Sequence, residues 1–521
     1  MFTSGSMARV LALGALVVSP ILVACGGSSG SGNGNGNGNG NGGNDAGSGV
    51  NTTPDAGGGN QQTGDSGSGG NGGQDSGGGG TFTEASHAPF PTIANFGIPV
   101  IATPKIVAIT FNNDANAAGI GSFVSSVGTS SWWDAVTKDY GVGAGTGTSV
   151  NVTTTLAANY TDDTAGGASY TWPAFVASTI TTAANNIPAP DANTIYAFFL
   201  PSTTTVTLSS NGQTEGTLCT GVGGYHLSTM SGSTPIIYAV VGECKGAALG
   251  DRTFASELDL LTFSSSHEIL EAATDPQLTN TAAGYYNAYV SGDQDDVAWN
   301  MAGDGEIADF CVDQFGFTTP DDEATAGSNV VERIWSISAA KAGTNPCLPV
   351  PSGEIYFNAA PVEGSDAQIV TQNTPVTFEV DAFSDAPKSW TLLAVDSDLL
   401  QAGTASVTAS FAGGSTETIS NQIPPLPSIA ATNGLKAQLT LTLTAALSAT
   451  KPFALVFLIS HDGTNLLTAA NDHYWPIVVT TSAEASSIGL MRKTGTNGFA
   501  QLPPEWRAEI AHKMQAIRNL R

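Results

Sequence analysis

The chain has 521 residues, of which only 12% are charged, and its formal net charge is −28 with 63 glycines. This length is enough for two or three domains that each bury a core. The 16 lysine and arginine residues against 44 acidic residues argue against a nucleic-acid partner, because the phosphate backbone would repel such a protein. The composition favours an extracellular protein.

Residues 1–24 have the pattern of a secretory signal peptide. Arg9 precedes a short apolar run that ends in L-V-A-C at Cys25, and a small-residue cleavage site after such a run is typical of export. The run is too short for an ordinary membrane span. Its ending resembles a bacterial lipobox, which implies a lipid on Cys25; a plain signal peptide is the alternative. We therefore expect a lipid-anchored cell-envelope protein, with the outer membrane or cell surface favoured, or a secreted protein.

Residues 25–81 consist mostly of Gly, Asn, Ser and Asp. A segment with so few apolar side chains cannot bury enough surface to offset the entropy that is lost on ordering. We predict a disordered tether that holds the folded part of the protein away from a membrane.

Residues 82–348 are predicted to form a first folded domain of the α+β class. Apolar, β-branched runs bounded by Pro and Gly are typical of buried strands, and longer periodic runs favour helices. Trp132 and Trp133 are expected to pack in the core. The predicted elements are strands at 105–111, 194–200 and 236–241 and helices at 120–127, 131–140 and 172–187.

One further helix is predicted to carry the candidate site. The apolar run 254–263 continues into S-S-S-H-E-I-L-E-A-A-T-D-P, and Pro276 ends the helix because the residue before a proline leaves the α region. His267 and Glu271 lie four residues apart and therefore share one face. An imidazole and a carboxylate one turn apart can bind one cation, and the neighbouring Glu268 could accept a proton from bound water.

This pattern resembles the H-E-x-x-H helix of zinc peptidases, with Glu271 in place of the second histidine. A carboxylate is a harder ligand than imidazole, which keeps zinc possible but makes calcium, manganese or iron more credible than usual. Zinc remains the first candidate for one divalent metal, with calcium or manganese as alternatives. The pattern is compatible with a zincin-like fold, in which the active helix lies beneath a sheet. The alternative to a metal site is that these residues form the water-exposed polar face of an amphipathic helix.

Further donors lie on both sides of this helix in the sequence. Glu306 and Asp309, three residues apart in G-E-I-A-D-F-C, offer two more carboxylates. Upstream, the segment G-G-Y-H ends at His226, and His226 or Tyr225 could stabilise a developing oxyanion if the fold brings them near. The predicted catalytic residues are Glu268 and His226, and the predicted metal ligands are His267, Glu271, Glu306 and Asp309.

Taken in order, these segments resemble the phosphate-induced protein 1 or EXORDIUM-like family over residues 95–348. The shared motifs are C…G-Y-H, Y-A-V-V-G…C, S-H-E-I-L-E-A-A-T-D-P and A-W…G-E-I-A-D-F-C, with the opening strand K-I-V-A-I-T-F. The resemblance implies that these polar motifs belong to one set; in plants the family is linked to growth and cell expansion in the apoplast. This chain departs from the family by inserting residues 277–297, which we expect to form a loop at the rim of the site.

Four cysteines remain after the tether, and an even number in an exported chain favours disulfides. Three connectivities are possible, and the two shortest loops, Cys219–Cys244 and Cys311–Cys347, are favoured. The second of these disulfides would hold the segment that carries Glu306. A cysteine-rich zinc site is the alternative, but the chain lacks the usual C-x-x-C pair.

Residues 352–481 are predicted to form a second domain, an all-β sandwich. Seven short β-type runs separated by turn residues are typical of this architecture. His461 and His473 are expected at its surface. Residues 482–521 are predicted to be a linker and an amphipathic C-terminal helix, which docks on the sandwich or lies on an anionic surface.

Two functions are compatible with these patterns. The first is a lipid-anchored extracytoplasmic metallohydrolase, peptidase-like, with its site on the H-E-x-x-E helix. The second is a non-catalytic surface or adhesion lipoprotein whose carboxylates hold a structural metal or a hydrogen-bonded network. The expected partners are the membrane, through the lipid, and an extracellular protein or polysaccharide. Glu268 separates the two functions, because a structural site has no need of an unligated carboxylate beside the metal.

Overall fold

The computed structural model describes residues 82–485 except 113, 164–169, 211–212, 221, 250–251, 278–282, 288–293, 303–304, 312–322, 363, 419–423, 450 and 464–471. The predicted signal peptide, tether and lipidated Cys25 lie outside the described residues, as does the predicted C-terminal helix beyond residue 485. Within the described part, no helix is long and apolar enough to cross a membrane. Mixed helices and strands agree with the predicted α+β class.

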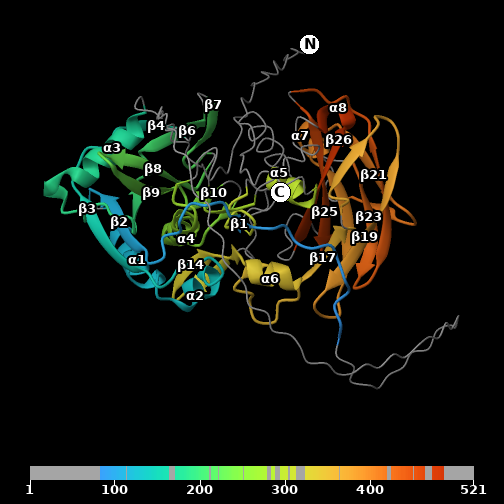
Figure 1. The fold of residues 1–521 in the computed structure, drawn as a ribbon, viewed down its shortest axis with the longest axis horizontal. Helices are drawn as coiled ribbons and strands as arrows, with labels where there is room; N and C mark the ends of the chain where they lie inside the picture. Colours follow the sequence, from blue (N-terminus) through green and yellow to red (C-terminus); the bar gives the residue numbers. More distant parts are fainter. Residues whose placement is uncertain are drawn as a thin grey trace, which may run out of the picture. The chain divides into compact units, whose positions relative to one another are not determined.

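The candidate site belongs to a region built on a five-stranded sheet (Figure 1). The strand order is β3-β2-β5-β9-β8, and all neighbours are parallel except β8, the antiparallel edge strand. The predicted strands at 105–111, 194–200 and 236–241 are confirmed as β2, β5 and most of β9. The bounds are β2 Lys105–Phe111, β3 Thr146–Val152, β5 Thr194–Leu200, β8 Gly224–Ser231 and β9 Thr234–Gly242.

Helices pack on both faces of this sheet, because its central strands are apolar on both sides. On one face, α1 (Ala117–Val127) and α4 (Glu257–Thr274) share a core with Ala108 of β2. On the other face, α3 (Thr171–Thr181) shares a second core with Val107. A small sheet joins this second core, with strands β4 Asn159–Asp163, β6 Thr205–Ser210 and β7 Gln213–Thr217.

Several helix ends differ from the predicted ones. α1 begins three residues earlier than predicted, α2 (Ser131–Thr137) ends before Tyr140, and α3 ends at Thr181 instead of continuing to 187. A 3-10 turn, Ala183–Asn185, follows α3. Helix ends depend on caps and tertiary contacts that periodicity does not reveal. Trp132 and Trp133 are buried, as expected.

The inserted segment 277–297 is only partly a loop. Its residues 278–282 and 288–293 lie outside the described residues, but Tyr285–Tyr286 forms strand β12, and helix α5 (Gln294–Ala302) begins before the insertion ends. Short strand pairs and one helix complete the region: β1 Ala94–Asn95 with β12, β10 Ala248–Leu249 with β11 Arg252–Thr253, β13 Glu323–Ala326 with β14 Asn329–Glu332, β15 Ile334–Trp335 with β16 Cys347–Leu348, and α6 Ile337–Ala342.

The segment after residue 352 contains two facing sets of strands, in orange and red in Figure 1. One sheet has the order β17-β19-β24-β21, and the other has the order β18-β26-β25-β20-β23-β22. All seven predicted strands are present, β25 with the predicted ends and the others with shifted ends, and β18, β22 and β23 were missed. The bounds are β17 Phe357–Pro361, β18 Ala367–Val370, β19 Val376–Ser384, β20 Ser389–Asp396, β21 Val407–Phe411, β22 Ser415–Glu417, β23 Leu426–Thr432, β24 Lys436–Leu443, β25 Phe453–His461 and β26 His473–Thr481, with helices α7 Ser397–Ala402 and α8 Ser482–Ala485.

The prediction that His461 lies at the surface is wrong. Its side chain is buried, and Nδ1 lies 2.7 Å from Oδ1 of Asp472. His473 is half-buried and contacts the ring of Tyr356 edge-on. Cross-strand partners decide the exposure of a residue at a strand end, and the sequence does not state them.

Aromatic residues connect α5 to the β-rich segment. Trp299 of α5 lies edge-on to Trp475 of β26, with ring centroids 5.2 Å apart, and 5.8 Å from Trp335. A buried ion pair joins Arg333 to Glu354 at 3.0 Å. Large buried contacts therefore hold Trp299 and Arg333, which follow the candidate helix in the chain.

A buried carboxylate lies on the sheet face opposite α4. The hydroxyls of Tyr225 and Tyr238 donate hydrogen bonds to Oδ2 of Asp162, at 3.0 and 2.8 Å. Burial raises the pKa of Asp162 to about 6, and the two tyrosine hydroxyls oppose that shift. Tyr225 therefore supports a second core and does not face the candidate site, so its predicted alternative role as an oxyanion donor is wrong.

We expect Asp162→Asn to flatten the dependence of stability on pH. A carboxyl group whose pKa is higher in the folded protein stabilises it below about pH 4 and loses that contribution as pH rises through 6. A shift of roughly two units corresponds to about 3 kcal/mol. Urea unfolding of wild type at pH 4 and pH 8 should show this loss, whereas Asp162→Asn should not. An equal change in the free energy of unfolding between pH 4 and pH 8 in both proteins would contradict the raised pKa of Asp162.

Candidate metal centre

α4 is buried along most of its length. Ser256 caps the start of the helix, because its side chain accepts a hydrogen bond from the backbone N–H of Asp259 at 3.1 Å, and the helix ends at Thr274 before Asp275. Every residue from Leu260 to Thr274 is buried. Polar side chains inside such a helix must find partners among neighbouring segments, because water is excluded.

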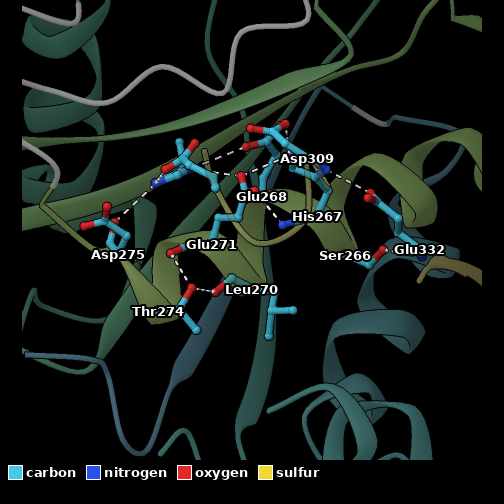
Figure 2. Close-up of polar contacts among 12 residues, drawn as sticks. Ser266, His267, Glu268, Leu270, Glu271, Thr274, Asp275, Asp309 and Glu332 are labelled. Atoms are coloured by element: carbon cyan, nitrogen blue, oxygen red, sulfur yellow. Dashed lines mark hydrogen bonds and ion pairs between the residues drawn. The ribbon is translucent and has the colours of Figure 1, made fainter. Parts of the chain in front are cut away.

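His267 lies among three carboxylates (Figure 2). Its Nε2 is 3.0 Å from Oε2 of Glu271, as predicted from their spacing, and 3.6 Å from Oδ1 of Asp309. Its Nδ1 is 2.9 Å from Oε2 of Glu332 on β14. A histidine with one nitrogen directed at ligands and the other bonded to a carboxylate is the usual arrangement of a metal-bound imidazole.

Glu332 was not predicted from the sequence. Its backbone N–H donates to Oγ of Ser266 at 3.0 Å, and its backbone oxygen accepts from Nε1 of Trp132 at 2.7 Å. These bonds attach β14 to both α4 and α2. The residue lies 65 positions after its partner His267 in the chain, and no local spacing reports such a contact.

His226 reaches the same cluster from the edge strand β8. Its Nδ1 lies 3.6 Å from Oε2 of Glu268 and 3.7 Å from Oε2 of Glu271. Its Nε2 lies 3.5 Å from Oε1 of Glu306 and 3.2 Å from the backbone oxygen of Asp275. The structure thus brings His226 and the helix together, which the order of the motifs alone could only suggest.

Two glycines make room for these side chains. A Cβ at Gly224 would lie 2.8 Å from Cγ and Oε1 of Glu268, so only glycine lets that side chain pass β8. Gly305 has a φ of +101°, and a Cβ there would meet the ring of Tyr286 at 2.4 Å. The G-Y-H and G-E-I-A-D segments therefore need their glycines for the close approach of backbone to side chain.

The segment 305–311 holds the remaining carboxylates. The backbone N–H of Ala308 donates to Oε1 of Glu271 at 3.1 Å, which ties the segment to α4. The Cys311–Cys347 disulfide follows directly, and the Cys219–Cys244 disulfide joins the chain before β8 to the chain after β9. Both disulfides are the predicted pairs.

The charged groups of the cluster shift one another's pKa values. Burial lowers the pKa of His267, but the carboxylates of Glu271 and Glu332 outweigh it and hold the pKa well above its usual value. The pKa of His226 is raised against burial by Glu268 and Glu271. Burial raises the pKa of Glu268. Carboxylates that favour a proton on a buried imidazole also favour a divalent cation, which competes with that proton.

The donor set fits a metal ion. All six predicted site residues gather in one place, and each is at most 6% exposed. Ligand atoms on a tetrahedral ion with bonds of about 2.1 Å lie roughly 3.4 Å apart, close to the 3.6 and 3.7 Å from Nδ1 of His226 to Oε2 of Glu268 and of Glu271. Two groups could hold an ion: His226, Glu271 and Glu306, and His267, Glu268 and Glu271.

Asp275 lies next to the cluster without joining either group. Its Oδ1 accepts a hydrogen bond from the backbone N–H of Gly284 at 2.8 Å, and burial raises its pKa to about 7. The side chain thus fixes the turn that ends α4. Its backbone oxygen, not its carboxylate, faces His226.

Comparison with known proteins finds no protein-family model that matches this chain and no curated relative. The resemblance to the EXORDIUM-like family therefore stays a prediction from motifs in the sequence.

Proposed function

We propose that this protein is an exported, lipid-anchored metallohydrolase of the peptidase type. The observation that carries the proposal is the convergence of two histidines and five carboxylates around the H-E-x-x-E helix. Export is supported by the two disulfides, which form in oxidising compartments. The position of α4 against a mixed sheet with an antiparallel edge strand is compatible with a zincin-like fold.

In this proposal His267, Glu271, Glu306 and Asp309 hold the cation, with zinc as first candidate. A bound divalent cation supplies Lewis acidity, which lowers the pKa of water and polarises a carbonyl group. Glu268, with a pKa raised by burial, accepts the proton of the attacking water and returns it to the leaving group. His226, whose pKa is raised by its carboxylate neighbours, stabilises negative charge on the substrate, or its neutral ring adds a ligand.

The test is Glu268→Gln beside wild type, assayed for hydrolysis of fluorescent casein and of a p-nitrophenyl ester. We expect the variant to keep its metal, since the ligands named above remain, and to lose 10²- to 10⁴-fold in rate (an order-of-magnitude estimate), the usual contribution of a general base. Glu379→Gln, on the exposed side of β19, is the matched control and should retain full activity. Full activity of Glu268→Gln would contradict the assigned base.

One observation favours a second candidate, a structural metal site in a non-catalytic surface protein. The donors are almost completely buried, whereas a catalytic metal keeps an open position for substrate. Under this alternative, wild type would bind metal and unfold more easily after chelation, but hydrolyse neither substrate. The ligand of the protein would then be an extracellular protein or polysaccharide bound elsewhere.

A further inference from the structure

We propose that the buried cluster binds two divalent cations and that Glu271 bridges them. The inference rests on the metal site of the proposed function and extends it from one ion to two. Each of the two groups that could hold an ion contains one histidine, and both groups contain Glu271. Two separate sets of donors that share one carboxylate are the arrangement of a two-ion centre.

The histidines approach Glu271 from opposite sides of the cluster. Oε2 of Glu271 lies 3.0 Å from Nε2 of His267 and 3.7 Å from Nδ1 of His226. His267 comes from α4 and His226 from β8, so the fold fixes the two rings independently. The shared oxygen can therefore face one ion on the side of each histidine.

Each histidine also has an outer acceptor on its other ring nitrogen. Nδ1 of His267 lies 2.9 Å from Oε2 of Glu332, and Nε2 of His226 lies 3.2 Å from the backbone oxygen of Asp275. An acceptor in this position holds the proton on that nitrogen and leaves the lone pair of the other nitrogen for a metal. In His267 that other nitrogen is Nε2, which faces Glu271. In His226 it is Nδ1, which faces both Glu268 and Glu271.

Further carboxylates complete each position. Glu306, assigned above to the single ion, belongs in the two-ion centre to the group of His226, where its Oε1 lies 3.5 Å from Nε2 of the ring. Asp309, whose Oδ1 is 3.6 Å from Nε2 of His267, offers a donor to the other ion. In this assignment it takes the place of Glu268, which the proposed function makes the base.

The charge of the cluster favours two ions over one. Buried carboxylates need compensating charge, and one divalent cation offsets two of the five negative charges here, whereas two cations offset four. Two-ion centres in hydrolases hold their ions about 3.5–4 Å apart and stabilise both the attacking and the leaving oxygen of the reaction. The five carboxyl groups are those of Glu268, Glu271, Glu306, Asp309 and Glu332, all buried.

The experiment uses the full-length protein, stripped with a chelator and titrated with Mn²⁺. Bound metal is counted by plasma mass spectrometry, and electron paramagnetic resonance reports whether two Mn²⁺ ions are magnetically coupled. We expect about two equivalents and a coupled spectrum in wild type. His226→Ala and His267→Ala should each retain one equivalent with an uncoupled spectrum. His461→Ala, which removes a buried histidine outside the cluster, is the matched control and should retain two.

The outcomes separate the two proposals. A single equivalent in wild type with an uncoupled spectrum overturns the two-ion centre and leaves the proposed metal site standing. No bound manganese, with none after zinc either, overturns both. If either histidine variant fails to fold, the wild-type spectrum alone shows whether two coupled ions are bound.

Discussion

Replacing Glu271 by alanine should abolish metal binding and lower the free energy of unfolding by about 3–5 kcal/mol. Its Oε2 faces His226 and His267, and its Oε1 accepts the backbone N–H of Ala308. Truncation leaves two buried imidazoles without their shared partner, and removing one partner of a buried charged pair is strongly destabilising. Urea unfolding and metal analysis of the purified variant measure the two effects.

A matched control is Glu257→Ala, at the partly exposed first turn of the same helix. It should change the free energy of unfolding by less than about 1 kcal/mol, as surface substitutions usually do, and should leave metal content unchanged. Wild-type stability in Glu271→Ala would contradict the role of this side chain as the centre of the cluster, whatever the metal content.

Removing the Cys311–Cys347 disulfide should also have a large effect. The bridged cysteines are 36 residues apart, and closing a loop of this length contributes about 4 kcal/mol on the chain-entropy estimate. Cys311 directly follows the segment of Glu306 and Asp309, so the double variant Cys311→Ala/Cys347→Ala should lose metal affinity as well as stability. Thermal unfolding and metal titration test both.

The second disulfide provides the comparison. Cys219 and Cys244 are 25 residues apart, so Cys219→Ala/Cys244→Ala should lose a similar amount, about 3–4 kcal/mol. This variant leaves the segment 305–311 attached and should keep its metal at temperatures where it is folded. Equal metal affinity in the two double variants would show that the Cys311–Cys347 disulfide does not hold the ligand loop.

The candidate helix could be predicted because its information is local. His267 and Glu271 lie one turn apart, and Pro276 ends the run, so spacing alone placed them on one face. Glu306 and Asp309 were found as a pair of carboxylates with the same spacing logic. The sequence did not predict Glu332. Its bond to His267 depends on the packing of β14 against α4, and the sequence of neither segment indicates that contact.

The strands also divide into those that a local sequence pattern predicts and those that it does not. β2, β5 and β9 are continuous apolar runs, which mark strands buried on both faces. β18, a four-residue strand, pairs in parallel with β26 more than a hundred residues later, and β22 has only three residues. Short edge strands carry too little pattern to be told from loops. The insertion was predicted as a loop because its length was visible, whereas the burial of Trp299 against Trp475 was not.

The central claim, that the cluster on α4 binds a divalent metal, is tested most directly by mass spectrometry of the metal content of purified wild type and His267→Ala. We expect at least one equivalent in wild type, zinc before calcium or manganese, and a clear loss in the variant. Wild type that binds none of these ions, even after soaking, would contradict the claim. The histidines and carboxylates would then form a buried hydrogen-bonded network without a metal.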